Sequence, residues 1–256
     1  MAIEEFANTS LQGIYAVAGA GWGGRASMAS IGTIRFDGKG HASGLMRQSV
    51  PGETFGERQL IEFPFEGSYQ VNADGSGTTL SMGGKFETRL AITRTEIVDG
   101  SRAAQEFSLM AKDLEPSTGS LNLATATRLP DTGKFSNASL KGAYVGVTIG
   151  RGGQTAGAGF GLIRYDGNGH FSEHNIANVQ GDSFRERRFV MGTDAGNYTV
   201  NADGTGFVAD GGVVFVITRA EIVDGIKIAH EYAFIVRELI PTTGNLFTGV
   251  TRRLSD

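Results

Sequence analysis

The chain contains two copies of one sequence about 125 residues long. Residues 92–100 read ITRTEIVDG and residues 217–225 read ITRAEIVDG, which is a single change over nine positions. Earlier pairs lie 129 positions apart: IRFDGKGH from 34 with IRYDGNGH from 163, and VNADGSG from 71 with VNADGTG from 200. The first copy carries four extra residues near SMGGKFET, where a hairpin loop accommodates them. A repeat of this length is far longer than a solenoid unit, so it predicts two complete domains.

Turn signals divide each copy into short apolar runs. Asp-Gly recurs between these runs, for example at Asp37-Gly38 and Asp74-Gly75, and this dipeptide suits tight hairpin turns. About eight strands per copy result, enough for an antiparallel sheet to close on itself. We therefore predict an all-β protein of two tandem up-and-down antiparallel β-barrels, with residues 1–128 and 135–256 as the barrels and 129–134 as linker. A single large sheet or sandwich shared between the copies is the alternative.

The order SLxGxY, GxIRFDGxGH, GSYQVNADGSG and a late apolar strand resembles bacterial calycin-type barrels related to lipocalins and to allene oxide cyclase. The resemblance covers each copy nearly end to end, and its marks are turn and strand signatures. The resemblance implies barrels that bind hydrophobic small molecules. Some barrels of this type isomerise or cyclise their ligand without a cofactor.

Composition excludes several partners and locations. The formal net charge is −4 and no Lys/Arg-rich run occurs, so we expect no nucleic-acid partner. The chain has no export signal and no apolar stretch of membrane-spanning length, which predicts a cytoplasmic protein without a membrane partner. A homo-oligomer is compatible with the sequence.

Motifs for phosphate, nucleophilic or metal chemistry are absent or weak. The glycine-rich stretches at 19–24 and 150–159 lack the ending of a phosphate-binding loop. EHN at 173–175 and AHEY at 229–232 contain ligand types for zinc or iron, but no closely spaced third ligand accompanies them. We therefore expect no metal and no cofactor.

Inward positions that differ chemically between the copies are candidate site residues, because the two copies share one scaffold. With a four-residue loop at each DGxG turn, Phe36 would share a face with Leu45, and Tyr165 with His174. In the late strand, Gln105 and Phe107 correspond to His230 and Tyr232. We therefore expect His174, His230, Tyr165 and Tyr232 to act in catalysis inside the second barrel.

Other residues are predicted to bind the substrate. Tyr198 and Phe234 are expected to line the same interior. Trp22 and Arg25, in the glycine-rich loop of the first copy, suit an aromatic or carboxylate-bearing ligand or a protein contact, although Trp22 packing on its own barrel is the alternative. Inward tyrosine and histidine side chains are equally compatible with a core whose polar groups are satisfied.

Three function classes remain open. The first is a cofactor-independent isomerase, cyclase or lyase that acts on a small hydrophobic or aromatic molecule by general acid/base chemistry, since histidine exchanges protons near neutral pH and tyrosine donates to an oxyanion. The second is a lipocalin-like carrier of such a molecule without catalysis, and the third is an interaction module.

Overall fold

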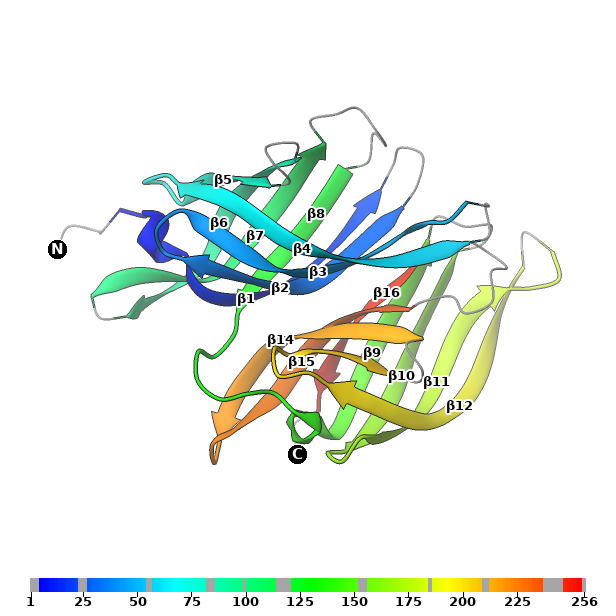
Figure 1. The fold of residues 1–256 in the computed structure, drawn as a ribbon. Coiled ribbons are helices and arrows are strands. Elements are labelled where there is room, and N and C mark those ends of the chain that lie inside the picture. Colours follow the sequence, from blue (N-terminus) through cyan, green and yellow to red (C-terminus); the bar gives the residue numbers. More distant parts are fainter. Residues whose placement is uncertain are drawn as a thin grey trace.

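A computed structural model describes residues 5–22, 27–53, 57–81, 86–98, 100–113, 121–151, 156–183, 186–208, 212–236 and 246–254. Its strands fall into two groups of eight (Figure 1). The first group is β1 (Gln12–Trp22), β2 (Met28–Asp37), β3 (His41–Pro51), β4 (Arg58–Val71), β5 (Ser76–Ser81), β6 (Phe86–Val98), β7 (Ser101–Asp113) and β8 (Leu121–Arg128). The second is β9 (Lys141–Arg151), β10 (Gly157–Asp166), β11 (His170–Gln180), β12 (Arg187–Val200), β13 (Thr205–Val208), β14 (Val213–Val223), β15 (Ile226–Val236) and β16 (Leu246–Arg253).

Each group forms a closed antiparallel barrel with its strands in sequence order. β1 closes the first barrel by pairing with β8, and β9 closes the second by pairing with β16. The prediction of two tandem all-β barrels is confirmed, and a single shared sheet is excluded. The domain ranges 1–128 and 135–256 stay a prediction.

Among the described residues, two short helices pack at one end of the barrels, which we call the base. η1 (Asn8–Ser10) precedes β1 and packs against β4 and β7, and η3 (Asn137–Ser139) precedes β9 and packs against β12 and β15. No helix among the described residues is long and apolar enough to cross a membrane.

A buried tyrosine holds each short helix in place. The Tyr69 hydroxyl lies 3.1 and 2.9 Å from the carbonyl oxygens of Asn8 and Leu11. The Tyr198 hydroxyl makes the same contacts with Asn137 and Leu140 at 2.9 and 2.8 Å. This arrangement is part of the scaffold, because both copies have it and it satisfies backbone carbonyls that close the base.

The DGxG turns set which side chains of the following strand face inward. Phe36 pairs directly with Ala42, and Tyr165 with Phe171. The turn contains three residues between strands rather than four, because Asp37 Oδ1 accepts hydrogen bonds from the backbone N–H groups of Lys39 and His41 at 2.7 and 3.0 Å. The predicted alternation of β3 and β11 is therefore wrong by one residue.

A β-bulge changes the alternation of the late strands as well. In the second barrel Arg219 pairs with Glu231 and Ala220 with Ala229, so His230 is passed over in the register. Ala229 and Tyr232 are both buried although they are three residues apart. The first barrel has the same irregularity between Ile92 and Thr95. Such an extra residue reverses the inward and outward positions beyond it.

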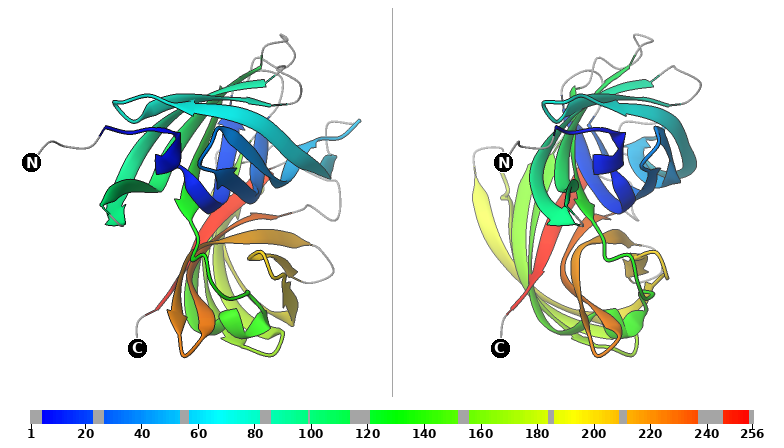
Figure 2. Two further views of the ribbon diagram at one scale, coloured as in Figure 1. Left: turned by 60° about the vertical axis from the view of Figure 1, so that its left-hand side comes forward. Right: turned by 90° about the vertical axis from the view of Figure 1, so that its left-hand side faces the viewer.

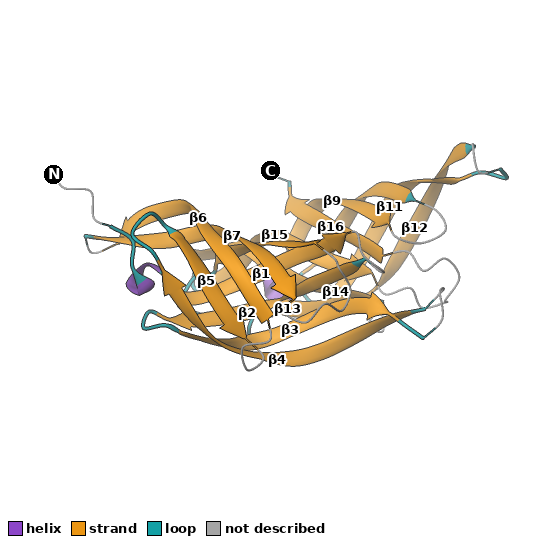
Figure 3. Cartoon of the chain, turned by 90° about the horizontal axis from the view of Figure 1, so that it is seen from above, coloured by secondary structure: helices purple, strands orange, loops and turns teal. Residues whose placement is uncertain are grey.

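The two barrels pack against each other through their outer walls (Figures 2 and 3). The contact uses β1 and β2 of the first barrel and β14 and β15 of the second. One buried cluster contains the outward residues Ala16, Ala29, Ile31, Val214, Val216, Ala233 and Ile235. The contact is therefore a dry apolar interface that joins different faces of the two copies.

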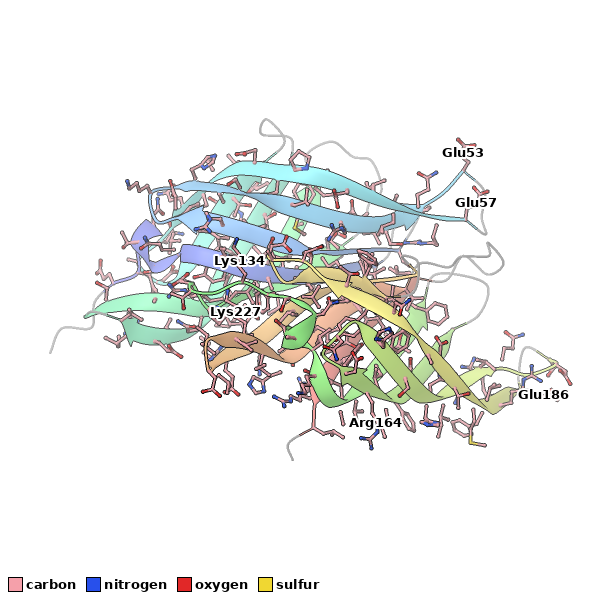
Figure 4. All side chains as sticks on the ribbon, turned by 60° about the horizontal axis from the view of Figure 1, so that its bottom comes forward. Glu53, Glu57, Lys134, Arg164, Glu186 and Lys227 are labelled. Atoms are coloured by element: carbon pink, nitrogen blue, oxygen red, sulfur yellow. The ribbon has the colours of Figure 1, made fainter. Side chains whose placement is uncertain are left out.

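The segment between the barrels is tied to the second barrel by Lys227 (Figure 4). Its Nζ donates a hydrogen bond to the carbonyl oxygen of Pro130 at 2.7 Å and lies 4.6 Å from the centre of the Phe135 ring. The connection therefore has a defined path over the second barrel.

Candidate functional site

The interior of the second barrel contains a cavity of about 360 Å³. Its apolar wall includes Ile163, Phe171, Val208, Val213, Phe234, Val236 and Phe247. The polar residues Glu173, Asn175, Tyr165 and Tyr232 also line it. An apolar cavity with a few polar groups is the usual form of a small-molecule site, and its volume lies at the small end of the range of roughly 300–1,000 Å³.

Five polar residues of this interior have no polar counterparts in the first barrel. The corresponding pairs, first barrel then second, are Phe36 and Tyr165, Gly44 and Glu173, Met46 and Asn175, Phe107 and Tyr232, and Ala126 and Thr251. Phe36, Met46, Phe107 and Ala126 are all buried in the apolar core of the first barrel. The barrel fold closes without the polar set, so these residues are not required by the fold.

Glycines make room for the polar groups. A Cβ at Gly161 would overlap Oε1 of Glu173, so the carboxyl group lies over the bare backbone of β10. Gly146, where the first copy has Val17, faces Thr251 Oγ1 in the same way. The first barrel also has a glycine at the position of Gly161, namely Gly32, but there Met46 fills the space; on β9 the change from Val17 to Gly146 opens further room.

Tyr165 and Tyr232 form a hydrogen-bonded pair at the inner end of the cavity. Their hydroxyl oxygens lie 2.6 Å apart, and both residues are buried. Burial raises the pKa of each hydroxyl well above the ordinary tyrosine range, so both groups keep their protons. One hydroxyl donates its hydrogen to the other within the pair, and the second hydroxyl can donate its hydrogen to a ligand oxygen.

Thr251 adds a further polar atom beside this pair. It lies opposite Tyr232 in the β15–β16 register and is fully buried. The Thr251 hydroxyl is close enough to Tyr232 to oppose the rise in the pKa of Tyr232. The two hydroxyl groups do not meet the geometry of a hydrogen bond. Thr251 Oγ1 has no hydrogen-bond partner among the described residues. Such a group has a desolvation cost, and Thr251 is not among the residues that line the cavity.

Glu173 supplies the acidic group of the site. Burial raises the pKa of its carboxyl, the negative charge of Asp194 raises it further, and a hydrogen bond from Asn175 opposes both. Asp194 lies directly opposite Glu173 in the β11–β12 register. The same carboxyl charge acts on the pKa values of Tyr165 and Tyr232, so the three groups form one electrostatic cluster.

His174 lies on the outside of the barrel, so the expectation that it faces the interior is wrong. Its neighbours Glu173 and Asn175 line the cavity, whereas His174 is exposed on the outer wall. The cause is the three-residue turn before β11, which reverses the predicted alternation. A general acid/base role inside the cavity is therefore not assigned to it.

His230 also faces outward. The bulge opposite Arg219 places it on the outer surface, where its Nε2 lies 3.0 Å from Glu221 Oε1. Its side chain is 43% exposed, and an exposed polar contact of this kind contributes little to stability. The prediction of an inward His230 is wrong for this reason.

The other predicted residues divide between the cavity and other places. Phe234 lines the cavity. Tyr198 is inward, but its hydroxyl is committed to the base of the barrel rather than to the cavity wall. Trp22 ends β1 and lines a groove between the two barrels. Arg25 lies outside the described residues.

Sequence comparison passed over Glu173, Asn175 and Thr251. The signal was present, since each replaces a small or apolar residue of the first copy. For Glu173 and Asn175 the predicted alternation, which turns His174 inward, places both of these side chains outward.

The raised pKa of Glu173 predicts a pH-dependent difference in stability. The folded protein keeps the Glu173 proton at pH values where the unfolded chain has already lost it. The free energy of unfolding therefore falls as pH rises from the pKa of Glu173 in the unfolded chain, about 4.3, to its higher pKa in the folded protein. Glu173→Gln should therefore gain melting temperature relative to wild type over this interval.

A control of opposite sign is Asp166→Asn. Hydrogen bonds from the backbone of His170 and Asn168 lower the pKa of Asp166 to about 2. Asp166 therefore stabilises the fold above its unfolded pKa, and this contribution is lost as pH falls toward 2. Thermal melts between pH 2 and 8 cover both intervals, and curves that stay parallel for wild type and Glu173→Gln above pH 4 would contradict the assignment.

The fold and the cavity together define a tandem β-barrel protein in which one barrel has a polar interior site. No family model and no curated protein matches the chain. Among solved structures, it is similar to CghA at 10% identity, covering 100% of this chain and 94% of that one, with a TM-score of 0.28. A CghA structure with Sch210972 gives 10% identity, coverage of 99% and 94%, and a TM-score of 0.26. A DUF3598-family protein of unknown function from Nostoc punctiforme PCC 73102 is 10% identical, with 99% of this chain and 100% of that chain covered and a TM-score of 0.27. Likeness at this level carries no information about chemistry.

Proposed function

We propose that the second barrel binds one small, mostly apolar molecule that carries an oxygen atom. The observation that supports this is the set of five polar interior residues, which the first barrel replaces with glycine or apolar residues on the same scaffold. The ligand oxygen accepts a hydrogen bond from the Tyr165–Tyr232 pair, which lines the cavity. The resemblance to calycin-type barrels favours the same ligand class.

β-Naphthol and naphthalene test this proposal, because they differ by one hydroxyl group. We expect one β-naphthol bound per chain, and binding weaker by about threefold to tenfold for naphthalene, as one hydrogen bond contributes about 0.5–1.5 kcal/mol. Ala177→Trp fills the cavity from its wall and should abolish binding. Gln48→Trp, at the corresponding position of the first barrel, should leave binding intact. Fluorescence titration measures the affinity of each variant for β-naphthol. Binding that survives Ala177→Trp would contradict the assignment of the ligand to this cavity.

A second candidate function is cofactor-independent isomerisation by Glu173. Its raised pKa and its proximity to two tyrosine donors favour this reaction. Glu173 would take a proton from a carbon next to a carbonyl, a tyrosine would donate a hydrogen bond to the carbonyl oxygen, and the proton would return to another carbon of the same molecule. His174 and His230 have no part in it.

Measuring turnover together with the binding titration distinguishes a carrier from an isomerase. The probe is a β,γ-cyclohexenone, whose conversion to the conjugated ketone is followed by ultraviolet absorbance. An isomerase should lose about a hundredfold or more of its turnover in Glu173→Gln while its affinity for β-naphthol changes little. A carrier should bind both probes without converting either.

A further inference from the structure

The outer wall of the second barrel carries an apolar row that continues beyond the contact between the barrels. Each residue of the row lies directly opposite the next on a neighbouring strand: Val216, Ala233, Val250, Val147, Phe160, Ile176 and Met191. Val216 and Ala233 are buried against the first barrel, and Val250 packs on the same cluster. From Val147 onward the row leaves that interface. We call its last four residues the outer row.

The outer row is exposed to a degree unusual for large apolar side chains. Val147 is 54% exposed, Phe160 53% and Met191 81%, and the neighbouring Phe189 on β12 is 74% exposed. The row borders a hollow that Leu162 and His174 also line. Contiguous apolar surface of this kind marks a contact with another molecule more often than it marks a free surface.

The first barrel shows what this position of the sheet contains when it faces water. Its equivalent of the outer row is Ala18, Ile31, Arg47 and Glu62, in the same cross-strand order. Ile31 is buried against the second barrel, and beyond it Arg47 and Glu62 form an ion pair of 2.7 Å. In the second barrel Ile176 and Met191 replace this ion pair. The second barrel therefore has two apolar side chains where the first barrel has an ion pair.

We propose that the outer row is the contact of a homodimer in which two copies pack the same wall of their second barrels around a twofold axis. A wall of β14 and β15 is already covered by the first barrel of its own chain. The corresponding wall of the first barrel also exposes apolar side chains, such as Met110, but Arg89 and Ser108 interrupt them, so it offers no unbroken apolar row. The outer row of a second copy offers an apolar match, and a surface that pairs with itself closes as a twofold dimer.

Charge does not oppose this pairing. No Lys, Arg, Asp or Glu belongs to the outer row. Glu186 lies at the tip of the β11–β12 ribbon and Arg164 near the far end of β10 (Figure 4), and Arg187 on β12 donates hydrogen bonds to Asn178 and to the carbonyl oxygen of Ala156. Two copies can therefore approach without burying like charges, which leaves hydrophobic burial as the driving force.

Sedimentation velocity on the full chain tests the proposal. We expect wild type to sediment as a dimer, and the double variant Ile176→Arg, Met191→Glu to raise the dissociation constant by at least about a hundredfold, because a desolvated charge opposes association. This variant restores the ion pair that the first barrel carries at the same sheet position, so its folding should be preserved. Far-ultraviolet circular dichroism checks the fold, and Met191→Glu alone, at the most exposed position, is the second variant.

Met110→Glu is the control, because Met110 is 49% exposed on β7 of the first barrel, outside the proposed contact. It should leave the dimer intact. A wild-type chain that stays monomeric, a dimer that the double variant does not weaken, equal weakening by Met110→Glu, or growth into larger open assemblies would each overturn the proposal.

Discussion

A chain whose second barrel carries the interior residues of the first is expected to bind β-naphthol about a hundredfold more weakly than wild type. The five substitutions are Tyr165→Phe, Glu173→Gly, Asn175→Met, Tyr232→Phe and Thr251→Ala. They remove the hydroxyl pair and the acidic group, and methionine refills part of the cavity. The lost hydrogen bond to the ligand hydroxyl, at about 0.5–1.5 kcal/mol, accounts for up to about tenfold, and the methionine side chain that fills part of the cavity accounts for the rest.

The same chain should be more stable than wild type by about 1–3 kcal/mol, because an unpaired buried hydroxyl costs about this much. The change removes Thr251 Oγ1, which has no partner among the described residues, and a carboxyl whose pKa burial raises. Urea unfolding measures the difference. A gain of stability together with a loss of binding is the expected sign of a site maintained for a ligand.

The control exchanges the two outward histidines for their first-barrel residues, His174→Leu and His230→Gln. Neither side chain faces the cavity, so the affinity for β-naphthol should change by less than about twofold. If this pair lowers affinity as much as the five interior substitutions do, the cavity is not the binding site.

Val216→Asp is expected to destabilise the contact between the barrels by about 3–5 kcal/mol or more. Val216 is fully buried against β1 and β2 of the first barrel, and a carboxylate there has no partner of opposite charge among the buried residues of that cluster. An unpaired buried charge is among the most destabilising changes to a protein. We expect the barrels to separate while each stays folded, because the substituted side chain points away from both interiors.

Ala91→Asp is the matched control, since Ala91 is the corresponding residue of the first barrel and is exposed. Its effect should stay within about 0.5 kcal/mol. Small-angle scattering should show an increased radius of gyration for Val216→Asp alone, and limited proteolysis should cut faster within residues 129–134. Equal behaviour of the two variants would show that the wall of β14 and β15 does not hold the barrels together.

Much of the architecture follows from the sequence. The duplication predicted two equivalent units, and the Asp-Gly turns between apolar runs predicted antiparallel hairpins. The same comparison of copies predicted Tyr165 and Tyr232 on one inward face, and their hydroxyl groups are in contact. These predictions succeeded because they needed only local turn chemistry and the alternation of side chains within one strand.

Alternation failed where it had to cross a turn or a bulge. The side-chain contact of Asp37 with two backbone N–H groups makes the DGxG turn one residue shorter than predicted. The bulge at Arg219 has the same effect on His230. Because side chains alternate with a period of two, each error of one residue exchanged the interior for the surface.

The sequence by itself determined that two β-barrels form and that their interiors differ. Only the tertiary structure decided that Glu173, Asn175 and Thr251 accompany the tyrosine pair, because these groups meet across β10, β11, β15 and β16. It also decided which walls are covered, since Val216 is buried and its counterpart Ala91 is exposed although both occupy the same place in the repeat. Local patterns fix the alternation within a strand, whereas turn length, bulges and packing between barrels fix which face of that strand meets a ligand, water or another barrel.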